Sequence, residues 1–187
     1  MKVTFLGHAC FLVEVNSQRL LFDPYISPNP LAQSIDLDCL QVDYVLLSHG
    51  HYDHVADVET IYRQCAPTIV ANLEMINWYK KKGIEKLLSF NQGGKRMLPG
   101  ETVVKAVHEP HASSMPDGSY AGSALGFIVQ GEEKTFYFAG DTALHQDMKQ
   151  IGEFRTINFA KLPIGGILTM DLEEALHAAH YMDTPTI

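Results

Sequence analysis

The sequence predicts a mixed α/β fold in which strands and helices are stacked in layers. Short runs near the start alternate apolar and polar residues and are separated by turns, which is typical of an antiparallel meander. Residues 44–47 form a continuous apolar run, which indicates a strand buried on both faces. Strand-like and helix-like segments then alternate, as in strand–helix units. The 187 residues are enough for one domain with a substantial core.

Short strands are expected throughout the first half of the chain. Besides 44–47, strands are predicted at residues 2–6, 10–15, 19–22, 68–71, 86–90 and 95–98. Helical spacing covers residues 55–64 and 73–82, and Asn72 is the expected N-cap of the second helix. A Gly93-Gly94 turn is expected to join the last two strands as a hairpin.

The second half repeats the interleaving of strands and helices. Strands are predicted at residues 102–108, 124–130, 134–139 and 158–164. Gly131 lies between the second and third of these and indicates a hairpin. Helices are expected at 144–151 and at 172–181, with Asp171 as the N-cap of the latter.

Composition narrows the classes of partner. The formal net charge of −8 and the pI near 5.5 argue against a broad surface for nucleic acid. No window of eighteen apolar residues is present, and the start lacks the pattern of a signal peptide. The three widely spaced cysteines suit free thiols in a reducing compartment. We therefore expect a cytoplasmic protein with a small-molecule substrate and neither a nucleic-acid nor a membrane partner; a homo-oligomer is left open.

The segment Ser48-His49-Gly50-His51-Tyr52-Asp53-His54 holds three of the nine histidines beside an aspartate. Imidazole nitrogens and carboxylate oxygens are the usual ligands of zinc and similar divalent ions. His49 and His51 can share one side of an extended loop, whereas Asp53 and His54 come from the following turn and aim at a neighbouring point. The segment therefore predicts a metal site, and two ions account for all four side chains better than one.

Further ligands are expected from other strand ends. Asp141 follows an apolar strand through Gly140 and could bridge two cations; the alternative is a helix N-cap made with Thr142. His108 and His111 both lie where the strand 102–108 gives way to a loop. Composition does not choose between these two histidines.

The arrangement strand–Leu-Leu-Ser-His-Gly-His-Tyr-Asp-His–helix resembles the metallo-β-lactamase fold superfamily, whose fold is an αββα sandwich. The segments Phe5-Leu6-Gly7-His8 and Phe22-Asp23-Pro24-Tyr25 are similar to its branch of small metal-dependent hydrolases, which includes ascorbate-phosphate lactonase-like proteins and the UPF0173-like group. The resemblance spans essentially the whole chain. It is supported by three further segments: His111-Ala112-Ser113-Ser114, Ala139-Gly140-Asp141-Thr142 and Leu162-Pro163-Ile164-Gly165-Gly166.

The resemblance implies a role for each site residue. One ion would be bound by His49, His51 and His111, which is thereby preferred to His108. The second would be bound by Asp53 and His54, and Asp141 would bridge the pair. Asp23 would orient a ligand histidine, the alternative being an aspartate that only ends a strand before Pro24.

The remaining histidines receive weaker assignments. His8 is either a turn histidine or a residue at the rim of the site. The three histidines of the predicted helical segments are expected at the surface or at an interface: His145, His177 and His180.

The superfamily pattern continues with another histidine on a strand after the last helix. This sequence ends at Thr184-Pro185-Thr186-Ile187, so we expect residues 1–187 to be one metallo-hydrolase domain shortened at its C-terminus and lacking that strand. Zinc is the first choice for the two divalent ions, and manganese, iron and nickel are compatible with the same ligands.

The predicted function is metal-dependent hydrolysis, in which metal-bound hydroxide attacks an ester, lactone or phosphodiester bond. Asp53 is the catalytic candidate that orients the nucleophile and takes its proton. The alternative is a non-hydrolytic metal- or metabolite-binding protein, or a di-iron redox protein, of the same fold. The loops 24–34 and 109–121 are expected to wall the pocket, and their small cationic content disfavours a heavily phosphorylated substrate.

Overall fold

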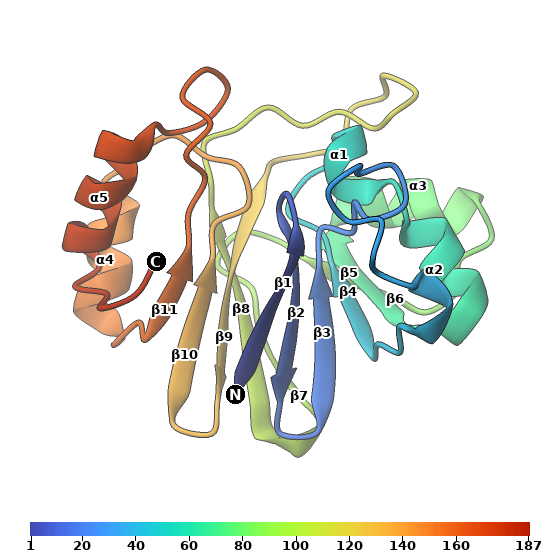
Figure 1. Cartoon of the computed structure of the whole chain (residues 1–187), viewed down its shortest axis with the longest axis horizontal. Coiled ribbons are helices and arrows are strands. Elements are labelled where there is room, and N and C mark those ends of the chain that lie inside the picture. The colour runs from blue at the N-terminus through green and yellow to red at the C-terminus, as the bar shows by residue number, and fades with distance from the viewer.

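The computed structural model describes all residues, 1–187, and consists of two facing sheets with helices on both outer sides (Figure 1). The six-stranded sheet has the order β1-β2-β3-β4-β5-β6, and the five-stranded sheet has the order β11-β10-β9-β8-β7. Helices α1 to α3 lie on the outer side of the first sheet, and α4 and α5 on that of the second. The predicted αββα class is therefore confirmed.

The first sheet begins as the predicted antiparallel meander and continues with parallel strands. Its strands are β1 (Lys2–Gly7), β2 (Cys10–Val15), β3 (Gln18–Phe22), β4 (Tyr44–Leu46), β5 (Thr68–Asn72) and β6 (Leu87–Phe90). The helices on its outer side are α1 (Tyr52–Val55), α2 (Val58–Cys65) and α3 (Leu73–Lys81), and a short 3₁₀ turn, η1 (Leu37–Cys39), precedes β4. Asn72 caps α3 as predicted, because its side chain accepts a hydrogen bond from the backbone N–H of Met75.

The single helix predicted over 55–64 is wrong: the structure has two helices, and the first begins within the histidine segment. The break falls at Asp57, a buried residue whose carboxylate accepts hydrogen bonds from the backbone N–H groups of Ile26, at 2.6 Å, and Ser27, at 2.9 Å. A long-range contact thus overrides the local periodicity.

The second sheet is antiparallel except for its last pair, β10 and β11, which are parallel. The 3₁₀ turn η2 (Pro99–Glu101) links β7 to β8. The strands are β7 (Lys95–Leu98), β8 (Thr102–His108), β9 (Leu125–Gly131), β10 (Lys134–Phe138) and β11 (Phe159–Lys161), and the helices are α4 (Asp147–Phe154) and α5 (Leu172–Tyr181). A capping box of Asp171 and Glu174 starts α5 at the predicted place.

Three further expectations need correction. β6 and β7 do not form a hairpin but belong to different sheets; Gly93 and Gly94 exchange backbone hydrogen bonds with Ala106 of β8 instead. The helix predicted from residue 144 begins at Asp147, because the preceding residues belong to the loop that follows Asp141. The strand predicted over 158–164 is only three residues long.

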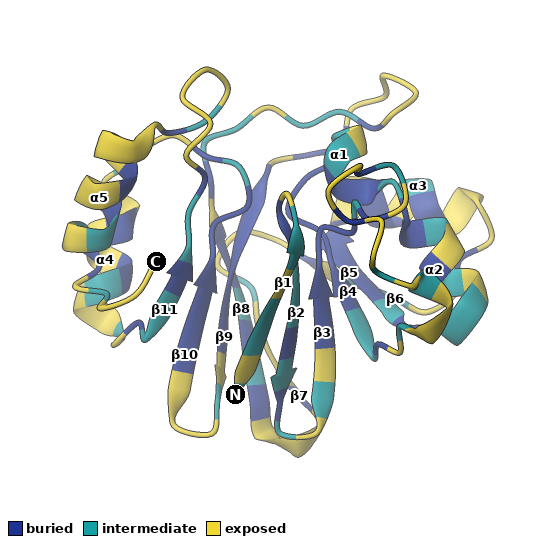
Figure 2. Cartoon of the chain, viewed as in Figure 1, coloured by how far each residue is buried: buried dark blue, intermediate teal, exposed yellow.

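Three apolar clusters separate the four layers. The central cluster lies between the sheets and includes Phe22, Phe127, Phe136 and Phe138. The other two lie between each sheet and its own helices. Both faces of the central strands are therefore buried, whereas the outer faces of the helices are exposed (Figure 2). None of the helices has the length and apolar character needed to cross a membrane.

Candidate metal centre

The predicted site residues gather at one end of the sandwich. They lie in the loops that follow β3, β4, β8 and β10, which end on the same side of the molecule (upper edge in Figure 1). The β4 loop packs tightly against the loop of residues 113–121. A Cβ atom on Gly50 would lie 2.6 Å from the Ala121 Cβ, and the Gly50 N–H donates to the Ser113 hydroxyl at 3.2 Å. Glycine between the two histidines therefore lets the loops approach each other.

His49, His51 and His111 form the first ligand cluster. One ring nitrogen from each lies within 4.8 Å of the others, and the His49 Nε2 and His51 Nδ1 atoms are 2.9 Å apart. Burial lowers the pKa of His49 well below its usual value, and the neighbouring His54 lowers it further. His49 is therefore a neutral imidazole, the form that ligates metals.

Asp53, His54 and Asp141 form the second ligand cluster. The His54 Nε2 atom lies 3.4 Å from a carboxylate oxygen of Asp141 and 3.9 Å from one of Asp53. The same Asp141 oxygen is 3.9 Å from His111 Nε2 in the first cluster. Asp141 thus lies between the two clusters.

The charges of the second cluster are strongly coupled. Burial alone would lower the pKa of His54, but the Asp23 and Asp141 carboxylates outweigh it and raise that pKa to about 9. Burial would raise the pKa of Asp141, but the His54 imidazole holds it well below its usual range. The hydrogen bond from His8 lowers the pKa of Asp53 to about 2. Both aspartates are therefore ionised at neutral pH.

Asp23 is fully buried behind the second cluster. Its carboxylate accepts hydrogen bonds from the Ser48 backbone N–H at 2.8 Å and from the Ser48 hydroxyl. Its second oxygen lies 2.7 Å from His54 Nδ1. This contact leaves His54 Nε2 free to face Asp53 and Asp141, the geometry expected of a carboxylate that orients a ligand histidine.

The donor set is able to hold a divalent metal. Imidazole and carboxylate are the ligands that such ions accept. The His54 Nε2 atom is buried and makes no well-formed hydrogen bond, although the Asp141 carboxylate lies 3.4 Å away, and a buried polar atom without one is costly unless something else binds it. The residues present therefore fit a metal cofactor.

His8 lies in the turn between β1 and β2, at the rim of the second cluster. Its Nε2 atom is 3.0 Å from an Asp53 oxygen, and its ring packs edge-on against Tyr25. The backbone of His8 has a φ of +53°, which non-glycine residues adopt rarely. His8, Asp53 and His54 together form another group whose ligand atoms lie within 4.8 Å of one another.

The other candidate histidines lie away from both clusters. His108 is exposed and pairs with Gln92 at 2.9 Å; His177 and His180 are exposed on α5, as expected. His145 is not a surface residue: its Nε2 atom lies 3.1 Å from the buried Glu109, whose other oxygen accepts a hydrogen bond from the Tyr137 hydroxyl. Burial raises the pKa of Glu109.

Glu109 had no predicted role. The available signal was its position directly after a strand, the same position that Asp23 occupies after β3.

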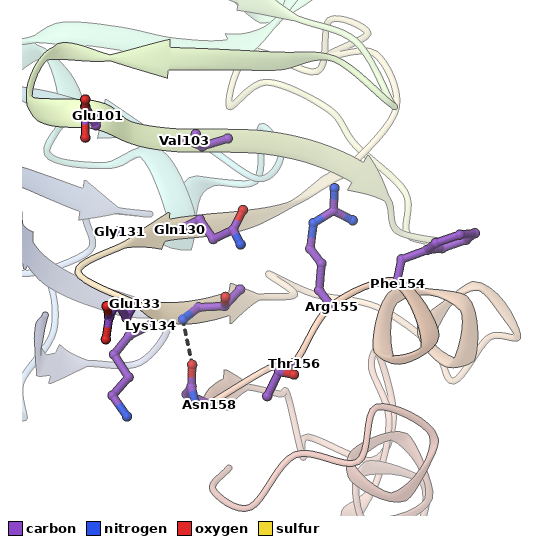
Figure 3. A pocket seen from close by; sticks show the side chains of 11 residues that line it. Glu101, Val103, Gln130, Gly131, Glu133, Lys134, Phe154, Arg155, Thr156 and Asn158 are labelled. Atoms are coloured by element: carbon purple, nitrogen blue, oxygen red, sulfur yellow. Dashed lines mark hydrogen bonds between the residues drawn. The ribbon is translucent and has the colours of Figure 1, made fainter.

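A cavity of about 410 Å³ opens beside the second cluster. It is bounded by His8, Asp53 and Asp141 on one side and by the segment 161–169 on the other. The expectation that loops 24–34 and 109–121 wall this cavity is wrong, because the chain after β11 folds over it instead. A larger hollow of about 660 Å³ lies at the opposite end of β10 and holds none of the predicted ligands (Figure 3).

Comparisons with known proteins agree with this geometry. Residues 18–187 match the family described as the beta-lactamase superfamily domain. A UPF0173 metal-dependent hydrolase of Methylacidiphilum infernorum is 47% identical over 98% of this chain and 80% of its own length. Another from Flavobacterium johnsoniae is 43% identical over 100% of this chain and 82% of its own length.

A solved structure shares both sequence and fold. Igni18, a metallo hydrolase from the archaeon Ignicoccus hospitalis, is 32% identical and superposes with a TM-score of 0.87, covering 97% of this chain and 78% of its own. The two-sheet architecture, the His/Asp cluster and these relatives lead to one assignment. The chain belongs to the beta-lactamase superfamily and, within it, to the UPF0173 metal-dependent hydrolases.

Proposed function

We propose that this metal-dependent hydrolase cleaves an ester, lactone or phosphodiester bond at a centre of two divalent cations. The observation that carries the proposal is the position of Asp141, whose carboxylate lies within 4 Å of a histidine nitrogen from each ligand cluster. A single carboxylate between two sets of ligands is well placed to bridge two neighbouring cations. Zinc is the first candidate, followed by manganese, iron and nickel.

The proposed ligands divide between the clusters. We assign His49, His51 and His111 to one cation and Asp53 and His54 to the other, with Asp141 bridging them. The close approach of the ligand atoms in each group supports this division. Cations bound there would polarise a substrate oxygen and lower the pKa of a water molecule.

Asp53 is the proposed catalytic residue. It is half-exposed and lines the cavity beside the second cluster. Because its pKa is about 2, the carboxylate is ionised at neutral pH and accepts a hydrogen bond from the attacking water. So acidic a carboxyl group holds a proton only weakly, which makes orientation of the water the larger part of its role.

The whole of residues 1–187 is proposed to act as one unit, because both sheets contribute ligands: His49 and His54 follow β4 of the first sheet, and His111 and Asp141 follow β8 and β10 of the second. The three cysteines are all unpaired. This supports a reducing compartment, the cytoplasm, as the proposed place of action.

The proposal is tested with His51→Ala and Asp53→Ala on protein loaded with zinc, manganese, iron or nickel. The substrates are p-nitrophenyl butyrate, a homoserine lactone and bis(p-nitrophenyl) phosphate. We expect each variant to lose at least about 100-fold in kcat/KM on a substrate that the parent hydrolyses, with an unchanged circular dichroism spectrum. His177→Ala, on the exposed face of α5, is the matched control.

Two results would contradict the proposal. One is undiminished hydrolysis by both variants. The other is a parent protein that binds metal but hydrolyses no member of the panel, which would favour the non-hydrolytic alternative.

A further inference from the structure

We propose that Lys161 binds a single negatively charged group of the substrate, next to the bond that is cleaved. This inference rests on the proposed function and adds to it a class of substrate: an ester, lactone or phosphodiester with one negative charge near the reacting centre and an otherwise apolar body.

The position of Lys161 places its ammonium group beside the metal centre. Lys161 is the last residue of β11 and pairs with Phe138, the last residue of β10. Its Nζ atom donates a hydrogen bond to the Gly140 carbonyl at 2.8 Å, and Gly140 directly precedes Asp141. The side chain lines the same cavity as His8, Asp53 and Asp141.

The ammonium group has fewer partners than its charge requires. An ammonium carries three N–H donors, and the Gly140 carbonyl is the only hydrogen-bond acceptor in the chain for Lys161. No carboxylate lies within 4.0 Å of its Nζ atom, and the ring of Phe138 is 5.1 Å away on one side. Lys161 is half-buried, and removing a cation from water is costly without a paired anion. A ligand in the cavity would supply that anion.

The electrostatic environment agrees with this geometry. Burial lowers the pKa of Lys161, whereas the more distant carboxylates of Asp141, Asp23 and Glu109 oppose the shift. Under the proposed function, the charge of Asp141 is compensated by bound cations. An anionic group of the substrate in the cavity would then take the place of Asp141 as the partner that stabilises the positive charge of Lys161.

The rest of the cavity limits the substrate to one such charge. Lys161 is the only lysine or arginine among its lining residues. The segment that follows Lys161 adds mostly apolar side chains to the same side of the cavity: Leu162, Pro163, Ile164, Ile167 and Leu168. A polyphosphate would find no second cationic side chain there, whereas a monoanion with an apolar body matches both the lysine and the apolar segment.

The test compares two substrates that differ by one carboxylate. p-Nitrophenyl butyrate is neutral, and mono(p-nitrophenyl) succinate has the same leaving group and a similar acyl chain that ends in a carboxylate. Bis(p-nitrophenyl) phosphate is the phosphodiester arm. The variants are Lys161→Gln, which can keep the hydrogen bond to Gly140 without the charge, Lys161→Met and Lys161→Arg. Lys134→Met, at the other end of the sheet, is the control (Figure 3).

We expect Lys161→Gln and Lys161→Met to lower the kcat/KM for the anionic substrates relative to the neutral one by about tenfold or more, mainly through KM. Lys161→Arg should retain part of the preference for the anionic substrates over the neutral one, and Lys134→Met should leave this preference unchanged. If Lys161→Met does not fold, Lys161→Gln and Lys161→Arg still separate charge from packing. Equal preference ratios in the parent and Lys161→Gln would overturn the inference.

A binding measurement separates this inference from the proposed function. The affinity of zinc-loaded protein for phenylphosphonate, measured by calorimetry, should fall at least about fivefold in Lys161→Gln. A parent that hydrolyses nothing but shows this Lys161-dependent affinity would refute the proposed function and leave the anion site standing. Hydrolysis that a chelator abolishes, together with equal phenylphosphonate affinity in parent and Lys161→Gln, would support the proposed function and refute the anion site.

Discussion

Asp23 holds His54 by its Nδ1 nitrogen, at 2.7 Å, so that the opposite ring nitrogen faces Asp53 and Asp141. Both side chains are fully buried. A histidine fixed in this way presents one defined tautomer to a cation, and its ring cannot turn without breaking the contact.

Replacing Asp23 by asparagine should therefore weaken metal binding. We expect a loss of about 10–100-fold in affinity, measured by competition with a chromogenic chelator. Asp43→Asn is the control, because Asp43 also accepts a hydrogen bond from a backbone N–H but lies at the surface. Parent-like affinity in Asp23→Asn would show that Asp23 only closes the end of β3.

Removal of metal should lower thermal stability. A ligand present at about 100 times its Kd stabilises a protein by about 2.7 kcal/mol, which corresponds to about 5–10 °C in Tm for a chain of this size. We expect this difference between zinc-loaded and EDTA-treated parent, with recovery after zinc is restored. His49→Ala should lose most of the difference, whereas His177→Ala should retain it. Identical Tm values for loaded and stripped parent would exclude a tight site.

Gly140→Ala should disturb both the fold and the centre. Gly140 has a φ of +66°, and a Cβ atom there would lie 2.5 Å from the Ser48 Cβ. Gly83 is the matched control, since it has a φ of +84° with nothing within 4 Å of the added atom. We expect Gly140→Ala to lower the free energy of unfolding by about 1–3 kcal/mol more than Gly83→Ala, in urea titrations. Equal losses would mean that only backbone strain matters at residue 140.

Thiol reactivity should follow the surroundings of each cysteine. Burial raises the pKa of Cys10, so we expect no reaction with a disulfide reagent until the protein unfolds. Cys39 is exposed, but its hydrogen bond to Asp36 raises its pKa. A smaller thiolate fraction at neutral pH makes Cys39 slow, and Asp36→Asn should speed its labelling roughly threefold. The Cys39→Ser variant identifies which kinetic phase of the labelling belongs to Cys39. Labelling of Cys10 in the native protein would contradict its burial.

The parts of the site that depend on neighbouring residues were predictable from the sequence. His49, His51, Asp53 and His54 stand together in the chain, and the structure places them as two adjacent groups of donors. Asp141 could also be predicted from the sequence, because a polar residue that follows a buried strand lies at the end of a sheet. The choice of His111 over His108 came only from the family resemblance, and the structure brings His111 to the first cluster while His108 is exposed.

The residues that sequence reasoning missed depend on pairing between distant strands. Lys161 reaches the cavity only because β11 pairs in parallel with β10, a relationship that no local pattern encodes. Glu109 and His145 meet across two loops, and the helical spacing around His145 predicted an exposed helix instead. In the same way, Asp57 binds the backbone N–H groups of the loop after β3, and this contact interrupts a segment that the sequence predicted as one helix.

Phe22 and Phe138 lie in different sheets, and their rings are 4.7 Å apart in the interior between them. Phe22 directly precedes Asp23, and Phe138 stands three residues before Asp141. The two halves of the centre are thus connected through a contact between hydrocarbon rings, several bonds away from any ligand atom. Core substitutions such as Phe22→Leu would then change the spacing of the ligands and with it the activity. A screen for altered activity would recover them beside substitutions of the histidines themselves.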